Sequence, residues 1–244
     1  MTTPTPRRAL VTGGSGDIGG AIAQALARDG HEVIVHANAN LARAQSVADA
    51  ITAAGGHARA VAFDVADAEA TRAALDALLA GSPIQVLVNN AGIHDDAPMA
   101  GMTDAQWHRV IDVSLHGFFH VTQPLLLPMA RARFGRIVSV SSVAAVLGNR
   151  GQANYAAAKA ALHGASKSLA REMASRGITV NVVAPGVIAG RMADDAFDPA
   201  WIKQAVPAAR AGTPEEVAAL VAFLCSDAAG YVNGQVIGVN GGMA

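Results

Sequence analysis

The sequence predicts an α/β fold, a single doubly wound parallel sheet with helices on both faces, and three observations lead to this prediction. Apolar strand-like runs alternate with Ala-rich helical segments from end to end. The run Val86, Leu87, Val88 is continuously apolar, as strands buried on both faces are. Hydrophobic residues make up 52% of the 244 residues and no linker divides the chain. We therefore expect one domain, residues 1–244, with a substantial core.

The order of the elements follows from the same patterns. Short runs rich in apolar and β-branched residues predict strands at residues 8–11, 32–36, 58–63, 84–89, 136–141, 179–184 and 235–239. Longer Ala-rich segments predict helices at residues 18–28, 41–54, 68–79, 104–131, 152–175 and 214–226. Strand–helix–strand steps connect in a right-handed sense, which gives a parallel sheet. Residues 189–211 are predicted to form a long irregular loop, which we interpret as a substrate lid.

Composition and charge exclude several functions. A net charge of −1 argues against nucleic acid as a partner. No apolar run reaches the ~18–20 residues of a membrane helix, and the first residues lack the apolar stretch of a signal peptide. Cys225 is the only cysteine, the eight histidines are scattered, and no Cys/His cluster has zinc-ligand spacing. We expect a cytoplasmic protein without a metal site, and we expect most histidines to be solvated or structural.

A glycine-rich loop, Thr-Gly-Gly-Ser-Gly-Asp-Ile-Gly at residues 12–19, follows the first strand and opens the first helix. Glycines there permit a tight turn and let the backbone approach a pyrophosphate, while the helix N-terminus supplies N–H groups. At this position the loop predicts a dinucleotide site. Asp17 is a conflict, because a carboxylate close to a pyrophosphate repels it. The same carboxylate, pointing aside in the first helical turn, favours the helix.

The end of the second strand distinguishes the two nicotinamide cofactors. An acidic residue there would bind the ribose hydroxyls of NAD. The stretch His36-Ala37-Asn38-Ala39-Asn40 has no carboxylate, which permits a ribose phosphate, and Arg43 is near in sequence. We expect NADPH, with Asn38 at the ribose. The alternative is that this turn does not contact the cofactor.

Tyr155 and Lys159 lie four residues apart in an Ala-rich segment, so a helix places both side chains on one face. A phenol has an ordinary pKa of about 10, and we expect the neighbouring ammonium to lower the pKa of Tyr155. Such a pair is suited to proton transfer in carbonyl or alcohol chemistry. The alternative is an exposed helix face that carries a Tyr and a Lys without function.

Taken together, these segments resemble the short-chain dehydrogenase/reductase family, whose fold is a Rossmann domain binding NAD or NADP. The resemblance covers essentially the whole chain. It rests on the loop at residues 12–19, Asp64-Val65, Asn89-Asn90-Ala91-Gly92, Ser142, Tyr155-x-x-x-Lys159 and Pro185-Gly186. Residues 148–149, 151–155, 166–172, 175–181 and 239–243 are similar to bacterial reductases of 3-oxoacyl groups on acyl carrier protein. Residues 92–98 are similar to members from polyene or aryl-polyene pathways.

The resemblance implies a role for each of these residues. Tyr155 would donate a proton to a ketone oxygen, Ser142 would hydrogen-bond that oxygen, and Lys159 would bind the nicotinamide ribose. The implied cofactor contacts are Gly13, Ser15, Asp17, Ile18, Asn38, Asp64, Val65, Asn90, Gly92, Tyr155, Lys159, Pro185, Gly186 and Ile188. Arg133 and Arg176 match residues that contact the acidic carrier protein.

Four positions depart from the family pattern. Asp17 stands where a glycine is usual, and Gly16 where a basic residue is frequent. Ser114 takes the place of the fourth catalytic residue, an Asn that holds a water in a proton relay. A Ser hydroxyl also hydrogen-bonds water, but it is shorter. Gly190 replaces a Thr that contacts the cofactor. We expect these changes to affect rate and cofactor affinity rather than the reaction class.

The function predicted from the sequence is NADPH-dependent reduction of a 3-oxoacyl thioester bound to acyl carrier protein, by a homotetramer, in fatty-acid or polyene biosynthesis. One alternative is a dehydrogenase or reductase of another small alcohol or ketone. Another is a nucleotide-binding subunit without catalysis, because Ser114 departs from the usual catalytic set.

Overall fold

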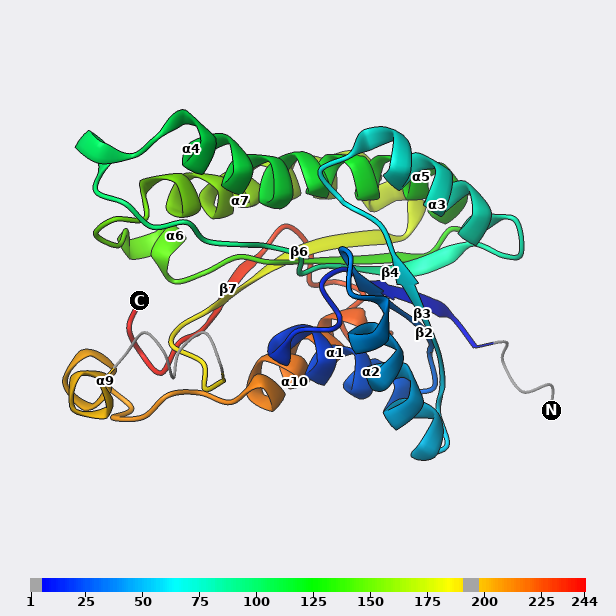
Figure 1. Cartoon of the computed structure of the whole chain (residues 1–244). Helices are drawn as coiled ribbons and strands as arrows, with labels where there is room; N and C mark the ends of the chain where they lie inside the picture. The colour runs from blue at the N-terminus through cyan, green and yellow to red at the C-terminus, as the bar shows by residue number, and fades with distance from the viewer. Residues whose placement is uncertain (1–5, 191–197) are drawn as a thin grey trace.

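A computed structural model describes residues 6–190 and 198–244 of the chain (Figure 1). Within these residues, seven strands form one parallel sheet in the order β3-β2-β1-β4-β5-β6-β7. The strands are β1 Arg8–Val11, β2 Glu32–Ala37, β3 His57–Ala62, β4 Ile84–Asn89, β5 Gly135–Val140, β6 Ile178–Pro185 and β7 Val236–Val239. The predicted fold class and the seven predicted strands are confirmed.

Helices cover both faces of the sheet (Figure 1). One face carries α1 Asp17–Arg28, α2 Leu41–Ala53 and α10 Pro214–Cys225. The other carries α3 Ala68–Leu79, α4 Asp104–Ile111, α5 Gly117–Ala132 and α7 Ala153–Met173. The short helices are α6 Ala144–Leu147 and α9 Pro199–Ala205, and the 3-10 turns are Met99–Gly101 and Ala174–Arg176. In the described part of the chain, no helix has the length and apolar character that crossing a membrane requires.

Two cores form because neighbouring side chains of a strand point to opposite faces of the sheet. In β1, Leu10 packs in the core that contains Leu75 and Leu125, whereas Val11 packs in the core that contains Ile22 and Val33. Each of these side chains is fully buried. Burying one of them stabilises the fold by ~1.5–3 kcal/mol, so the sheet is held firmly between its two helical layers.

The prediction of one continuous helix at residues 104–131 is wrong, because the helix is interrupted. A π-helical turn, Asp112–His116, lies between α4 and α5. It turns Ser114 into the interior, where the side chain is only 3% exposed. Directly after it, Gly117 lies so close to the segment after β3 that an added Cβ would be 2.9 Å from Val65 Cγ2. The apolar periodicity of a π turn differs too little from that of an α-helix over five residues to be seen in the sequence.

The predicted irregular loop at residues 189–211 is also wrong in part, because α9 lies inside it. The Asp198 carboxylate accepts a hydrogen bond from the Ala200 N–H at 2.9 Å, and Pro199 occupies the first turn. An Asp-Pro pair is a typical helix start, so the signal was present in the sequence. Residues 191–197 of the predicted lid lie outside the described residues.

The sheet order reverses between β1 and β4. From β1 the chain runs outward through β2 and β3, and then returns to β4 on the other side of β1. At such a switch point the loops that follow the two strands diverge and leave a crevice at the carboxyl ends of the strands. The loops after β1 and β4 are the glycine-rich loop and the segment that begins at Asn90.

Candidate active site

The glycine-rich loop is held by the segment that follows β4. Asn90 Nδ2 donates to the carbonyl oxygens of Thr12 at 2.9 Å and Gly13 at 3.1 Å. Gly13 has a φ of +62°, and a Cβ added there would lie 2.9 Å from Asn90 Nδ2. A Cβ added to Gly19 would collide with the Gly13 carbonyl oxygen. This close approach of loop, helix and Asn90 leaves a backbone cradle that fits a diphosphate at the start of α1.

Two positions that depart from the family pattern touch each other. The Asp17 carboxylate, in the first turn of α1, lies beside Gly190, which follows β6. A Cβ added to Gly190 would be 2.8 Å from Asp17 Oδ2, and the φ of +135° at Gly190 is a conformation that favours glycine. The space for a side chain at residue 190 is therefore taken by the side chain of residue 17.

Arg43, in the helix that follows β2, contacts the glycine-rich loop. Asn38 is exposed directly after β2, and Asn40 caps α2 by accepting from the Arg43 N–H at 3.1 Å. Arg43 Nη2 donates to the Ser15 carbonyl oxygen at 3.0 Å. The guanidinium of Arg43 thus reaches from α2 to the glycine-rich loop.

Asp64 and Val65 follow β3, and the first side chain is exposed whereas the second is buried. The Asp64 carboxylate is exposed and accepts from the Ala66 N–H at 2.9 Å. The Val65 side chain is buried in the core, and its carbonyl oxygen lies 2.9 Å from His120 Nδ1. A contact from Val65 to an adenine ring would therefore come from its backbone and not from its side chain.

Tyr155 and Lys159 lie in the first turns of α7, and buried Asn154 anchors that end of the helix. Asn154 Nδ2 donates to the carbonyl oxygens of Asp95 at 2.9 Å and Gln106 at 3.1 Å. The Tyr155 N–H donates to Asn154 Oδ1 at 2.8 Å. Asn154 thereby fixes the start of α7 against α4. The sequence does not predict this role, because an Asn in a helix start carries no signal of a tertiary contact.

The Lys159 side chain is buried, and the Tyr155 side chain is half-buried beside it. Burial raises the pKa of Tyr155, and the charge of Asp96 raises it further, against a hydrogen bond with Ser142 that lowers it. Burial lowers the pKa of Lys159 to about 8. Lys159 Nζ donates to the Val140 carbonyl oxygen at 2.9 Å. The expected lowering of the Tyr155 pKa by Lys159 is therefore wrong for this structure, because burial is the largest influence and Lys159 is not among its causes.

Ser114, in the π-helical turn, lies near Gly92, which the Lys159 side chain also approaches. A Cβ added to Gly92 would lie 2.8 Å from Lys159 Nζ and 3.6 Å from Ser114 Oγ, so all three residues meet. Within the described residues, Ser114 Oγ is a buried hydroxyl with no hydrogen-bond partner. A buried polar atom without a partner points to a ligand or relay position. The structure thus places Ser114 and Lys159 on the same side of Gly92.

Ser141 and His163 form a second tie between β5 and α7. Ser141 Oγ donates to the Lys159 carbonyl oxygen at 3.0 Å and lies 2.8 Å from His163 Nε2. Ser142 is the next residue, and its Oγ accepts from the Ala144 N–H at 3.1 Å. The tie therefore sets the spacing between Ser142 and the helix that carries Lys159. No sequence signal marks it, because the two residues are far apart in the chain.

The segment after β6 passes the same edge of the sheet. The Val143 N–H donates to the Pro185 carbonyl oxygen at 2.7 Å, which joins this segment to the Ser142 loop. The Gly186 N–H donates to the Val239 carbonyl oxygen at 2.9 Å, and Ile188 pairs with Gly212 in an isolated bridge. The implied nicotinamide contacts thus lie beside the predicted catalytic residues.

The two predicted partner-binding arginines lie together, but away from this site. Arg133 Nη2 donates to the Ser175 carbonyl oxygen at 3.2 Å, and Arg176 is the next residue. Arg133 precedes β5 and Arg176 precedes β6, whereas Ser142 follows β5. The strand β5, six residues long, spans ~20 Å between the amino edge of the sheet, where the arginines lie, and the carboxyl edge, where Ser142 lies.

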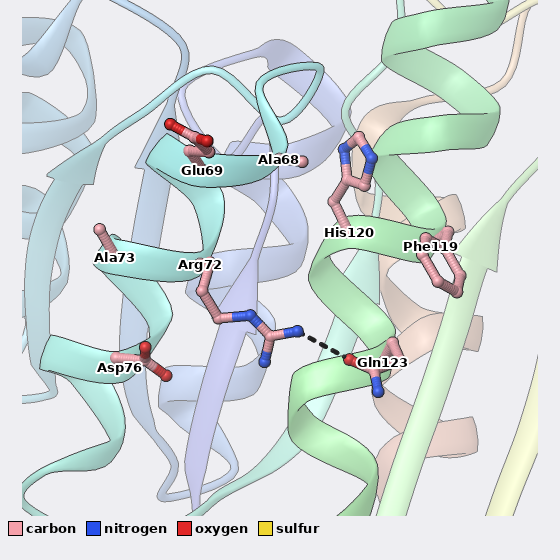
Figure 2. Close-up of a pocket in the computed structure, with 8 residues that line it drawn as sticks. All are labelled: Ala68, Glu69, Arg72, Ala73, Asp76, Phe119, His120 and Gln123. Atoms are coloured by element: carbon pink, nitrogen blue, oxygen red, sulfur yellow. Dashed lines mark hydrogen bonds between the residues drawn. The ribbon is translucent and has the colours of Figure 1, made fainter.

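A cavity lies elsewhere, between α3 and α5. It has a volume of about 420 Å³, and Figure 2 shows Arg72 reaching across it from α3 to Gln123 of α5. None of the predicted site residues lines it. A smaller cavity of about 130 Å³ lies beside Val187, Val206 and Gly241, next to the segment after β6. Across residues 6–190 and 198–244, no group of three or more metal-ligating side chains is placed to hold a metal ion.

Comparisons with known proteins agree with this geometry. A family model described as Enoyl-(Acyl carrier protein) reductase matches residues 14–244. A protein of Synechocystis named 3-oxoacyl-[acyl-carrier-protein] reductase is 45% identical over 245 residues, covering 100% of this chain and 99% of that protein. Proteins with the same enzyme name from Aggregatibacter actinomycetemcomitans and Escherichia coli are each 44% identical. They cover 96% of this chain and 98% and 96% of their own lengths, respectively.

A solved structure is similar over nearly the whole chain. It is described as a putative gluconate dehydrogenase from Agrobacterium tumefaciens, with 35% identity and a TM-score of 0.93. It covers 97% of this chain, and this chain covers 95% of it. The sheet, the glycine-rich loop and the edge that carries Tyr155 therefore belong to an architecture shared by oxidoreductases.

Proposed function

Because the chain belongs to the short-chain dehydrogenase/reductase family, we propose that it reduces a 3-oxoacyl thioester on acyl carrier protein to the 3-hydroxyacyl thioester, with NADPH as cofactor. The observation that carries this proposal is the meeting of Ser142, Tyr155 and Lys159 in a chain about 45% identical, end to end, to proteins named as such reductases. The pathway, fatty-acid or polyene synthesis, is part of the proposal, as is a cytoplasmic location.

The chemistry follows from the protonation states of the site. Bound NADPH supplies the hydride. Tyr155 holds a proton, because burial raises its pKa, and it donates that proton to the carbonyl oxygen that Ser142 orients. Negative charge that grows on this oxygen is stabilised by both hydroxyls. Lys159 and the buried Ser114 hydroxyl both approach Gly92, and we assign to them the return of a proton to Tyr155.

NADPH is proposed over NADH because of the end of β2. No carboxylate lies there to repel a ribose phosphate, and Asn38 is exposed. The Arg43 guanidinium, bound to the Ser15 carbonyl oxygen, supplies a positive charge beside the loop. Steady-state kinetics with both cofactors test this point. A higher kcat/KM with NADH than with NADPH contradicts it.

Carrier protein binding is proposed at Arg133 and Arg176, whose cations suit an acidic surface. These residues lie ~20 Å from Ser142 of the same protomer, at the other edge of the sheet. In the proposed homotetramer, a carrier docked there would serve either this site or that of a neighbouring copy.

The test is an assay of NADPH oxidation with a 3-oxoacyl group on carrier protein and on coenzyme A. A second candidate, oxidation of a polyhydroxy acid such as gluconate, is favoured by the similar solved structure. NADP reduction with gluconate tests it in the same assay. Turnover of the thioester and none of gluconate supports the proposal. Turnover of gluconate alone overturns it, and turnover of neither leaves a nucleotide-binding protein without this activity.

A further inference from the structure

His36, near the end of β2, is hydrogen-bonded at both ring nitrogens and only 1% exposed. The Gly13 N–H donates to Nδ1 at 3.1 Å, and Nε2 lies 2.8 Å from the Phe63 carbonyl oxygen. A backbone amide can only donate and a carbonyl can only accept. The imidazole is therefore neutral, with its proton on Nε2, and it accepts from Gly13 while donating to Phe63.

The ring connects three segments around the cofactor cradle. Gly13 belongs to the glycine-rich loop, and Asn38 follows His36 by two residues. Phe63 directly precedes Asp64, and its ring packs on His36 with the two ring centroids 4.2 Å apart. One side chain thus joins the loop that cradles phosphate to the segments assigned to the ribose and the adenine.

The loop is held from two sides at one peptide. Asn90 Nδ2 donates to the Gly13 carbonyl oxygen from the β4 side, and His36 accepts the Gly13 N–H from the β2 side. Gly13 adopts a positive φ of +62°, a conformation that local sequence does not enforce in a glycine. Contacts to both polar groups of the residue are what select it.

We propose that His36 is a positioning residue for the cofactor, which holds the glycine-rich loop in its phosphate-binding conformation by accepting the Gly13 N–H. This role deepens the proposed function and rests on it for the identity of the cofactor. Burial lowers the pKa of His36 to about 4, with the Phe63 carbonyl and the charge of Asp64 acting in the opposite sense. The neutral ring that the role requires therefore persists at neutral pH.

The variants separate the hydrogen bond from the volume of the ring. His36→Phe fills the space but has no nitrogen, so the buried Gly13 N–H loses its acceptor. His36→Asn is the matched control, because its amide oxygen stands where Nδ1 stands and can accept from Gly13. His36→Ala removes both nitrogens and most of the volume, and it replaces His36→Phe should that variant not fold.

Two measurements are made on each variant. Hydrogen–deuterium exchange of the cofactor-free protein reports the loop itself, on a peptide that covers residues 12–18. Equilibrium binding of NADPH and NADH, followed by nicotinamide fluorescence, reports the cradle. We expect His36→Phe to exchange faster in this peptide and to raise the Kd of both cofactors roughly tenfold. We expect His36→Asn to stay within about threefold of the wild type, and kcat at saturating NADPH to change little in either.

Several results would overturn the role. One is an unchanged Kd and unchanged exchange in His36→Phe, and another is a His36→Asn variant as impaired as His36→Phe. A loss for NADPH but not NADH would assign the effect to the ribose phosphate rather than to the diphosphate that both cofactors share. Faster exchange spread equally over β5 and β6 would mean a purely structural histidine. A wild type that binds NADPH but does not turn over the thioester overturns the proposed function and leaves this inference standing.

Discussion

The Lys159 ammonium lies in a site closed to water, with the Val140 carbonyl oxygen as its hydrogen-bond partner. Its pKa, lowered to about 8 by burial, places its loss of charge close to neutrality. We expect kcat/KM, which reports the free enzyme, to fall as the pH rises through about 8. The reason is that the cation near the reacting oxygen is lost. A pH profile of thioester reduction measures this, and a profile that stays level through that range contradicts it.

The same burial means that the charged form of Lys159 lowers the free energy of unfolding. Its folded pKa of about 8 lies below the ordinary 10.5, so between these values the unfolded chain holds a proton that the folded chain has released. Stability therefore rises with pH across this range. Lys159→Met should abolish reduction and raise the free energy of unfolding at neutral pH by on the order of 1 kcal/mol or more. Thermal unfolding beside the wild type measures it, and a lower Tm in the variant is the contrary outcome.

Tyr155→Phe removes the hydroxyl that donates the proton and keeps the ring in its place. Since general acid catalysis contributes ~10²–10⁴-fold, kcat should fall by at least that order while the Kd for NADPH stays nearly unchanged. Ser114→Ala is the companion variant, and it should cost less because Ser114 acts only through a relay. Near-normal turnover in Tyr155→Phe would remove the assignment.

At the scale of elements, the N-terminus of α1 touches the segment after β6 through Asp17 and Gly190. Gly190→Ala introduces a Cβ 2.8 Å from Asp17 Oδ2, at a φ of +135° that disfavours any side chain. It should lower the Tm and raise the Kd for NADPH. Asp17→Gly in the same chain should restore the part of the loss that the contact causes, with a coupling free energy of ~0.5–3 kcal/mol. The four variants of a double-mutant cycle measure it, and strictly additive losses would show that the two positions are independent.

Sequence patterns locate most elements because buried parallel strands and Ala-rich helices differ strongly in composition. The motif residues Ser142, Tyr155 and Lys159 come together as predicted, since each follows a strand or opens a helix at the carboxyl edge of the sheet. The π turn around Ser114 and the raised pKa of Tyr155 were not predicted. The first changes the helix pattern by too little to see, and the second depends on burial, which only the folded chain defines.

Hydrogen bonds between distant segments were missed for a similar reason. His36 looked like one of several scattered histidines, although its ring joins Gly13 to Phe63. Asn154 and the Ser141–His163 pair likewise have partners far along the chain. No local pattern distinguishes such a residue from a solvated one, because its function is defined by topology.

At the scale of the whole molecule, the edge of the sheet where the strands begin and the edge where they end carry different functional residues. The carboxyl edge carries the glycine-rich loop, Ser142 and α7, and the amino edge carries Arg133 and Arg176. Glu substitution of either arginine should lower kcat/KM for the carrier-bound substrate several-fold and leave the coenzyme A thioester nearly unaffected. Exposed charges act mainly on encounter rate, so added salt should lower activity on the carrier-bound substrate selectively.

Arg28→Glu is the matched control, since it makes the same change of charge at an exposed position at the end of α1, on the other face of the sheet. It should leave both substrates unaffected. Equal losses on both substrates in the Arg133 and Arg176 variants would instead indicate a structural role or a disturbed subunit interface. No loss on either would remove the carrier protein from the proposal.

The distance between the two edges also bears on how this protein can evolve. Substitutions at the turns before β5 and β6 leave Ser142, Tyr155 and Lys159 in place, because those residues are fixed by contacts at the far ends of the same strands. A gene duplicate could therefore acquire a new delivery partner by surface drift alone while inheriting its chemistry unchanged. In this architecture, the proposed reaction and the proposed carrier-binding surface can therefore be inherited and changed independently.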